Sequence, residues 1–285
     1  MCYTQSRFNA LLSACVMSLI ATAGWSQSLT WLGTLGGGVS WALGVSADGS
    51  VVVGTVSYDG YDPFGEYYYY ERAFRWTVDG GMQDLGTLDG DESAAYGVSA
   101  DGAVVVGWSD GRAFRWTVDG GMQDLGTLGG VGGWALGVSA DGSVVVGWAD
   151  NAAGQYRAFR WTVDGGMQDL GTLGGGWSEA YGVSADGAVV VGWSYDAAGQ
   201  RRAFRWTVDG GMQDLGTLGG NWSGARGVSA DGAVVVGWSY DAAGQPRAFR
   251  WTASGGMEDL NTTYASLLTN GSVLVWAFAI SPNGR

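Results

Sequence analysis

The chain has 285 residues and a formal net charge of −13, from 27 acidic residues against 14 basic ones, and every basic residue is an arginine. Since nucleic acids and anionic membranes are themselves negatively charged, this acidic balance opposes both as partners. Histidine and lysine are absent, and both cysteines lie within the first 15 residues. Without these side chains the remainder of the chain lacks the groups for Ser–His–Asp triads, thiol nucleophiles, Schiff bases and ordinary zinc sites, and we expect no cofactor.

The amino terminus has the pattern of a secretory signal. Arg7 supplies a positive charge, residues 10–23 (ALLSACVMSLIATA) form an apolar run too short to span a bilayer comfortably, and residues 21–23 match the small-x-small cleavage pattern. We expect a signal peptide over residues 1–23 and a mature protein that is secreted, extracellular or periplasmic, with no membrane span. As an alternative, residues 12–15 (LSAC) fit a lipoprotein box, which would attach a lipid to Cys15.

Residues 24–285 consist of repeated copies of one unit. The motif GVSADG or a close variant recurs, and its first glycine steps along the chain by 53, 40, 45 and 45 residues. A period of this size is typical of solenoids and propellers. The predicted units cover residues 41–88, 94–128, 134–173, 179–218 and 224–260, and a partial terminal repeat covers 261–285.

The shortest copy shows what one unit builds. Runs of apolar and aromatic residues, GVSA (97–100), AVVVGW (103–108), RAFRWT (112–117) and MQDLGTL (122–128), are separated by Asp-Gly pairs, which favour tight hairpins. These runs predict four antiparallel strands, a to d. The VVV run of strand b has no polar alternation, so both of its faces should be buried between stacked sheets.

Four-stranded sheets repeating every 40 to 45 residues predict an all-β, β-propeller-like fold. We expect five antiparallel blades, with partial terminal strands that form an incomplete sixth. A β-helix is the main alternative, but its coils are usually shorter and lack three hairpin turns per period.

The segments outside the regular pattern give further expectations. Residues 29–37 (LTWLGTLGG) predict a lone strand d, and residues 58–71 replace the usual b–c turn of the first unit with an insertion. Residues 262–268 (TTYASLL) suggest a single helical turn. Residues 272–284 resemble a degenerate strand a followed by its turn.

Charges that recur in every copy predict structural roles. Ten of the 14 arginines flank Ala-Phe in strand c, as Arg112 and Arg115 do, and aspartates recur in the a–b turn and in strand d. We expect these arginines and aspartates to form bidentate hydrogen bonds where blades meet. Phe114 and Trp116, on one face of strand c, predict packing between blades.

Antiparallel order places the a–b and c–d turns at one end of each blade and the b–c turns and d-to-a crossings at the other. The first set is nearly constant among copies, whereas the second varies. Varied loops on a constant scaffold are typical of a binding surface. The predicted ligand-binding residues there are Tyr67, Tyr68, Tyr69, Tyr70, Trp134, Trp177, Trp222, Tyr195 and Tyr240.

The order RAFRWT, GGMQDLGTLGG and GVSADGSVVVGW resembles the HAF family of bacterial extracellular repeat proteins, over residues 29–285. The resemblance implies a secreted or surface repeat protein. The family's His-Ala-Phe triplet has arginine in place of histidine here, for example at Arg112, so a role that rests on imidazole is not implied. The family's last repeat normally continues through further strands, which suggests that Arg285 is an early end.

Three functional hypotheses follow. The first is a non-catalytic binding or structural module that uses the variable loops on glycans or a surface protein. The second is a carbohydrate-active hydrolase, since glycoside hydrolysis needs two carboxylates. The unrepeated acids available for it are Glu66, Glu71, Asp89, Asp91, Glu92 and Glu179. Three of these, Asp89, Asp91 and Glu92, could also offer oxygen ligands to calcium. The third is a truncated, non-functional copy.

Overall fold

The computed structural model describes residues 29–61 and 63–284. The predicted signal peptide and the alternative lipid site at Cys15 lie outside these residues. The chain divides into two compact units, Met1–Trp31 and Leu32–Arg285, and the second contains all the strands and the helix given below. Among the described residues, no helix is both long enough and apolar enough to cross a membrane.

The second unit consists of five four-stranded antiparallel sheets, each formed by four consecutive strands, and this confirms the predicted fold. Blade 1 contains β1 (Val39–Val45), β2 (Val51–Tyr61), β3 (Tyr67–Thr77) and β4 (Gly81–Asp84). Blade 2 contains β5 (Ser93–Val98), β6 (Val104–Ser109), β7 (Arg112–Thr117) and β8 (Gly121–Asp124). Blade 3 contains β9 (Gly129–Val138), β10 (Val144–Asn151), β11 (Tyr156–Thr162) and β12 (Gly166–Asp169).

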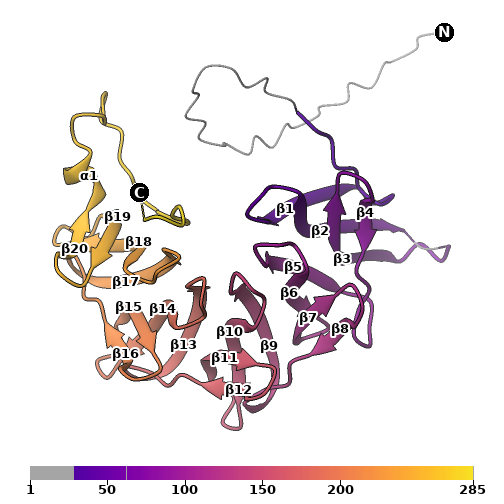
Figure 1. The fold of residues 1–285 in the computed structure, drawn as a ribbon, viewed down its shortest axis with the longest axis horizontal. Coiled ribbons are helices and arrows are strands. Elements are labelled where there is room, and N and C mark those ends of the chain that lie inside the picture. The colour runs from indigo at the N-terminus through magenta and orange to yellow at the C-terminus, as the bar shows by residue number, and fades with distance from the viewer. Residues whose placement is uncertain (1–28, 62, 285) are drawn as a thin grey trace. The chain divides into compact units, whose positions relative to one another are not determined.

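Blade 4 contains β13 (Gly174–Val183), β14 (Val189–Asp196), β15 (Arg201–Thr207) and β16 (Gly211–Asp214). Blade 5 contains β17 (Gly219–Val228), β18 (Val234–Asp241), β19 (Pro246–Thr252) and β20 (Gly256–Asp259), and the short helix α1 (Leu260–Thr263) follows it. In each blade the first strand lies innermost and the fourth lies at the rim, as Figure 1 shows. This is the radial arrangement of propeller blades.

The hydrophobic core lies between successive blades. Between blades 1 and 2, for example, Val53 and Ala73 of the first pack against Val105 and Phe114 of the second, and all four are fully buried. Equivalent clusters fill the other three gaps between neighbouring blades. Burying one such phenylalanine is worth about 1.5–3 kcal/mol, so the repeated contacts stabilise the stack, and the predicted burial of strand b is confirmed.

A series of backbone hydrogen bonds also links the blades through their SADG turns. The amide of Ala100 donates to the carbonyl of Ala140 at 2.9 Å, and each blade's turn repeats this contact with the next. The last bond runs from Ala230 to the carbonyl of Pro282 at 3.0 Å. Residues 281–284 therefore occupy the position that the turn of a further blade would take.

The repeated charges act differently from the prediction. The first arginine of each pair bonds within its own blade, as Arg112 does with Asp124 at 2.8 Å. In blades 1 to 4 the second arginine reaches the next blade, but its partner is a backbone carbonyl: Nε of Arg205 donates to Gly232 at 3.3 Å. In blade 5 the second arginine, Arg250, pairs with Glu258 of its own blade at 3.0 Å. The predicted bidentate Arg–Asp pairs between blades are wrong, because the turn aspartates accept hydrogen bonds within their own turns, as Asp186 does from Ser184 at 2.6 Å.

Several predicted strand boundaries also need correction. Strand a of the shortest copy is Ser93–Val98, because Ser99 already belongs to the turn that Gly102 closes by donating to its carbonyl at 3.0 Å. Strand d ends at Asp124, because Gly126 adopts φ +78° and leaves the extended region. Residues 29–37 form no strand for the same reason, since Gly33 has φ +95°.

At the carboxyl end, the helical turn begins earlier than residue 262. The carboxylate of Asp259 accepts a hydrogen bond from the amide of Asn261 at 2.8 Å and so caps helix α1. Residues 272–284 contain no assigned strand, yet they lie against blade 5: the amide of Ala248 donates to Leu274 at 2.9 Å and that of Ala277 to Gly237 at 3.3 Å. They form the incomplete sixth blade.

Candidate functional site

The variable loops gather at one end of the blades, as antiparallel pairing requires. In blade 4 the start of the first strand pairs with the end of the second, Gly174 with Asp196, next to the b–c turn. The a–b turn, which Gly187 closes, lies at the opposite end of the same ladder. We call the end formed by the b–c turns and the starts of the first strands the variable face.

Two equivalent hollows on the variable face contain four of the predicted residues. In blade 4 a hollow of about 420 Å³ is lined by Trp177 and Tyr195, and in blade 5 one of about 290 Å³ is lined by Trp222 and Tyr240. Glycines from the start of the first strand and residues of the b–c turn, including Asp196 in blade 4 and Asp241 in blade 5, complete each lining. Trp177 and Trp222 are 46% and 49% exposed, so both indole rings are accessible to a ligand.

Aromatic contacts continue from these hollows across neighbouring blades. The ring of Trp177 lies 6.0 Å from that of Tyr195 and 5.8 Å from that of Tyr156 in blade 3. Tyr156 in turn lies 4.6 Å from Trp148. Comparison of the repeats did not single out Tyr156, although its position, arginine in blade 4 and proline in blade 5, is one that varies.

The predicted residue Trp134 has a different environment. Its ring stacks on Tyr96 of blade 2 at 5.6 Å and on Trp148 of its own blade at 5.8 Å, and it lies 5.6 Å from Trp108. Burial raises the pKa of the Tyr96 hydroxyl to about 12. Because of these ring contacts Trp134 is only partly exposed, and it connects the aromatic side chains of blades 2 and 3.

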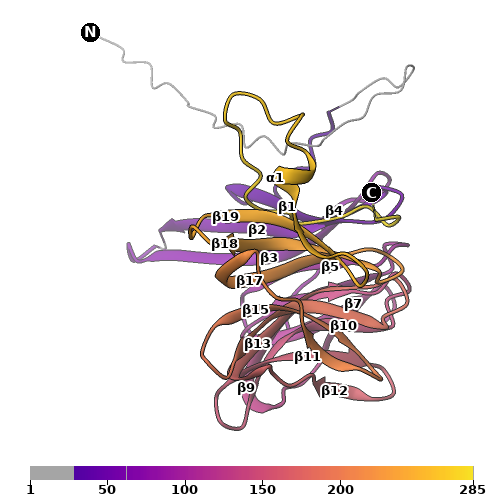
Figure 2. The same cartoon turned by 90° about the vertical axis from the view of Figure 1, so that its left-hand side faces the viewer.

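The four tyrosines at positions 67–70 belong to a hairpin rather than to a loop. Strands β2 and β3 continue through the insertion with Tyr58 paired to Tyr70 and Tyr61 to Tyr67, and Figure 2 shows this hairpin extending past the neighbouring strands. The rings of Tyr58 and Tyr70 stack at 4.9 Å. Tyr67, Tyr68 and Tyr69 are 58%, 43% and 49% exposed. Among the described residues, no ring contact joins this hairpin to the tryptophans of blades 3 to 5.

The unrepeated acids do not form a common site. Asp89 forms an ion pair with Arg112, and Glu71 accepts a hydrogen bond from the hydroxyl of Tyr69 at 2.6 Å. Within the described part of the chain, no three acidic, histidine or cysteine side chains gather closely enough to hold a metal ion, and this includes Asp89, Asp91 and Glu92.

Glu179 belongs to a separate cluster between blades 4 and 5. Its carboxylate accepts hydrogen bonds from the hydroxyl of Tyr181 at 2.5 Å and from Nε1 of Trp193 at 3.1 Å. Burial, followed by the Glu179 charge, raises the pKa of the Tyr181 hydroxyl. The guanidinium of Arg226 lies 3.9 Å from the ring centre of Tyr181, and that of Arg201 lies 4.0 Å from the ring centre of Trp193.

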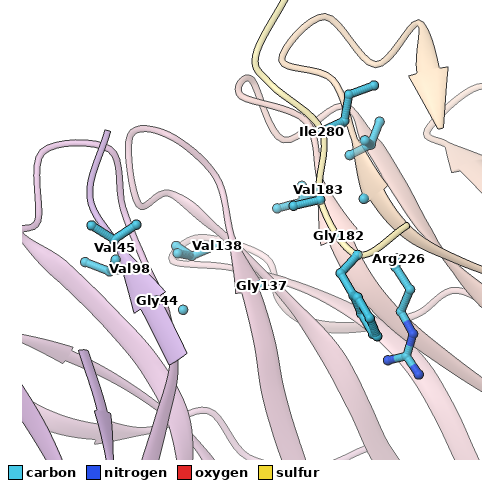
Figure 3. A pocket seen from close by; sticks show the side chains of 14 residues that line it. Gly44, Val45, Val98, Gly137, Val138, Gly182, Val183, Arg226 and Ile280 are labelled. Atoms are coloured by element: carbon cyan, nitrogen blue, oxygen red, sulfur yellow. The ribbon is translucent and has the colours of Figure 1, made fainter. Parts of the chain in front are cut away.

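Arg226 also lines an open central hollow of about 290 Å³ between the innermost strands. Each first strand contributes a Gly-Val pair to the lining, such as Gly137 and Val138, and residues 278–280 complete it. Arg226 is the charged side chain among these lining residues, which Figure 3 shows. Sequence reasoning did not identify Arg201 or Arg226, although both interrupt the repeat: the other copies have leucine or tyrosine at the position of Arg226.

Comparison with solved structures places the fold among β-propellers. A putative TolB from Agrobacterium tumefaciens matches with a TM-score of 0.54 and 20% identity over 78% of this chain and 80% of its own. TolB from Acinetobacter baumannii matches with a TM-score of 0.51 and 14% identity over 77% of this chain, which spans 53% of that protein's length.

The β-propeller domain of the Trilobed protease from Pyrococcus furiosus, described as having an open velcro topology, matches with a TM-score of 0.51 and 8% identity, over 79% of this chain and 72% of its own. At these identities the similarity concerns the fold alone. No protein-family model and no curated protein matches the sequence. The second unit is thus a β-propeller-fold repeat domain of five complete blades.

Proposed function

We propose that this chain is a secreted or cell-surface, non-catalytic binding module that recognises glycan chains through the variable face. The proposal rests mainly on the paired hollows of blades 4 and 5, in each of which an exposed tryptophan and a tyrosine stand beside glycine backbone. A sugar ring has a flat C–H face and a polar edge. An open hollow with an aromatic wall and nearby backbone groups suits both.

The spacing of the hollows supports a chain-like ligand. The same hollow recurs in successive blades, so one polymer could contact both, and binding two weak sites at once raises the overall affinity. The resemblance to extracellular repeat proteins and the predicted signal peptide agree with a glycan partner outside the cell. The acidic charge of the chain opposes nucleic acid as a partner.

The experiment is a glycan array followed by calorimetric titration of the hits, with the full chain and two variants, Trp177→Ala and Trp222→Ala. Each variant is expected to weaken binding about tenfold or more, because a tryptophan that supplies much of the contact area is a typical hot spot. The matched controls are Val163→Ala and Val208→Ala. These residues are 67% and 66% exposed in the c–d turns, at the opposite end of the blades.

The tyrosine hairpin of blade 1 provides a second, separate test of the face. Replacing Tyr67 to Tyr69 with alanine removes three exposed rings and leaves the buried cores between blades untouched. If the ligand also contacts blade 1, this triple variant weakens binding without lowering the melting temperature. Unchanged affinity would restrict the proposed site to blades 3 to 5. A hit whose affinity survives both tryptophan variants would refute the proposed function.

The alternative, a carbohydrate-active hydrolase, is tested on the same ligands. Glu179 is the unrepeated acid that lies beside aromatic side chains and close to the blade 4 hollow, so it is the carboxylate to change. This alternative is favoured over a binding module if the protein hydrolyses a polysaccharide that it binds, and if Glu179→Gln abolishes this hydrolysis but leaves the binding unchanged.

A further inference from the structure

Three charged side chains interrupt the repeat where blades 4 and 5 meet. Arg201 stands where blade 3 has Tyr156 and blade 5 has Pro246, and Arg226 stands where the other first strands have leucine or tyrosine. Glu179 replaces the tryptophan, alanine or glycine of the other copies. Because the scaffold forms without these charges in the other blades, their role is specific to this location.

The two arginines also differ from all others that the structure describes. Every other described arginine donates to a carboxylate, a backbone carbonyl or a glutamine, or lies within 4.0 Å of an aspartate. Arg201 and Arg226 contact only aromatic faces, and Nε of each is buried without a hydrogen-bond partner. Nε of Arg157 is buried in the same way, but the guanidinium of Arg157 donates to Gln155 through a terminal nitrogen at 2.9 Å. A buried donor without an acceptor is costly, and a bound anion would supply the missing acceptor.

The surroundings of this pair favour a negative ligand. Two guanidinium groups and one carboxylate give a local charge of about +1. The carboxylates of Asp196 and Asp241, which line the hollows, are paired with Arg202 and Arg247. Burial lowers the pKa of Arg201, although the nearby Tyr181 and Glu179 oppose this shift. The carboxylate of Glu179 accepts hydrogen bonds from Tyr181 and Trp193, and the rings of these two residues lie against the guanidinium groups of Arg226 and Arg201.

Arg201 lies between the two hollows of the proposed glycan site. Its guanidinium is 4.0 Å from the ring centre of Trp193 and 5.4 Å from that of Trp238. Trp193 contacts Tyr195 of the blade 4 hollow at 5.3 Å, and Trp238 contacts Tyr240 of the blade 5 hollow at 5.8 Å. A saccharide chain that occupies both hollows would therefore pass this arginine.

From these contacts we infer that Arg201 and Arg226 bind the carboxylate of an acidic saccharide whose neighbouring rings occupy the hollows of blades 4 and 5. The planar guanidinium donates two parallel N–H groups to a carboxylate, and the aromatic rings beneath orient it for that geometry. This inference rests on the proposed function, because it specifies the class of glycan that the variable face recognises.

The test uses oligomers of galacturonate, glucuronate and mannuronate, each beside its carboxyl-reduced neutral counterpart, titrated calorimetrically into the full chain. At least one acidic oligomer is expected to bind about tenfold or more tightly than its neutral counterpart. The variants Arg226→Leu and Arg201→Tyr insert the residues that blade 3 has at the same positions, so the fold tolerates them. Each is expected to abolish the preference for the acid.

The matched control is Arg112→Gln, which removes the same charge from an arginine already paired with Asp124 in blade 2 and should leave the preference intact. The inference is overturned if no acidic oligomer binds more tightly than its neutral counterpart, if the preference survives both arginine variants, or if a sulfated, carboxyl-reduced chain binds equally well. If a neutral oligomer binds as tightly as the acidic one and Trp177→Ala abolishes this binding, the proposed function is supported and the arginine site is not. If the affinity for an acidic oligomer is unchanged in Trp177→Ala and Trp222→Ala, the arginine site is supported and the proposed hollows are not.

Discussion

A single aspartate in each SADG turn shows how a repeated charge stabilises its own segment. Asp141 accepts hydrogen bonds from the hydroxyl of Ser139 at 2.7 Å, from the amide of Ser143 at 3.0 Å and from its hydroxyl at 2.8 Å. These bonds, led by that from Ser139, lower the pKa of the carboxyl from 3.8 to about 2. The negative charge is therefore stabilised by the folded turn itself.

The variant Asp141→Ala tests this role through its pH dependence. A lowered pKa in the folded state contributes stability above pH 3.8, and this contribution is lost as the pH falls toward about 2. At pH 5 we expect the variant to be less stable by about 1 kcal/mol, since the site is exposed and screened. The difference should vanish near pH 2, as measured by urea unfolding at both pH values.

The control for this prediction is Asp164→Ala, which removes an exposed aspartate from the c–d turn of the same blade. It should change stability little at either pH. A destabilisation by Asp141→Ala that is the same at pH 5 and pH 2 would mean that the carboxylate charge is not what stabilises the turn.

Single residues were predictable where their role is local. The turn chemistry of Asp-Gly and the burial of the VVV run depend on neighbours in sequence, and both agree with the structure. The partner of Arg205 was not predictable, because Gly232 lies in the next blade and the contact depends on how blades stack. Arg201 and Arg226 are recognisable only when unrepeated residues, rather than repeated ones, are compared among the copies.

At the scale of the strand, glycines in strand b explain how strands a and b approach. A Cβ added at Gly147 would overlap the carbonyl oxygen of Trp134 and lie 3.0 Å from Cα of Ala135. The register between β9 and β10 shifts at this point, where Val146 pairs with Gly137 and Gly147 with Ala135. A bulge of this kind brings the two backbones together, and only glycine fits there.

We therefore expect Gly147→Ala to destabilise the protein by more than about 2 kcal/mol, because the added methyl group meets backbone that cannot rotate away. Gly165→Ala in the same blade is the matched control. Its Cβ would approach Oγ1 of Thr162 at 2.8 Å, a side chain that can adopt another rotamer. Guanidinium unfolding of both variants measures the difference, and equal stabilities would contradict the close approach at the bulge.

The elements themselves were only partly predictable. Four strands per copy and their antiparallel order follow from alternating apolar runs and turn pairs, and the sheets confirm both. The first strand of blade 3 extends back to Gly129, into a glycine-rich segment with no strand propensity, because pairing with β10 stabilises it. Likewise residues 58–61 and 67–70 pair as a hairpin, although the insertion stands where the other copies have a b–c turn.

At the scale of the whole domain, residues 272–284 determine how the exposed side of the last complete blade, blade 5, is covered. Val234, Val236 and Trp238 of blade 5 are only 8%, 5% and 4% exposed. A Cβ added at Gly284 would lie 3.0 Å from the Val234 side chain, so the terminal segment covers the face that a following blade would cover elsewhere. Three backbone hydrogen bonds attach this segment to blade 5, from Ala230, Ala248 and Ala277.

Removing residues 272–285 is expected to destabilise the domain by about 2–4 kcal/mol, since the apolar side chains of blade 5 would lose their cover and three backbone bonds would be lost. Thermal unfolding and fluorescence of an apolar dye measure the loss and the new exposure. Pro282→Ala is the control, because Pro282 contributes a backbone carbonyl that alanine supplies equally well in the other turns. Unchanged unfolding of the shortened chain would show that blade 5 is stable with that face uncovered.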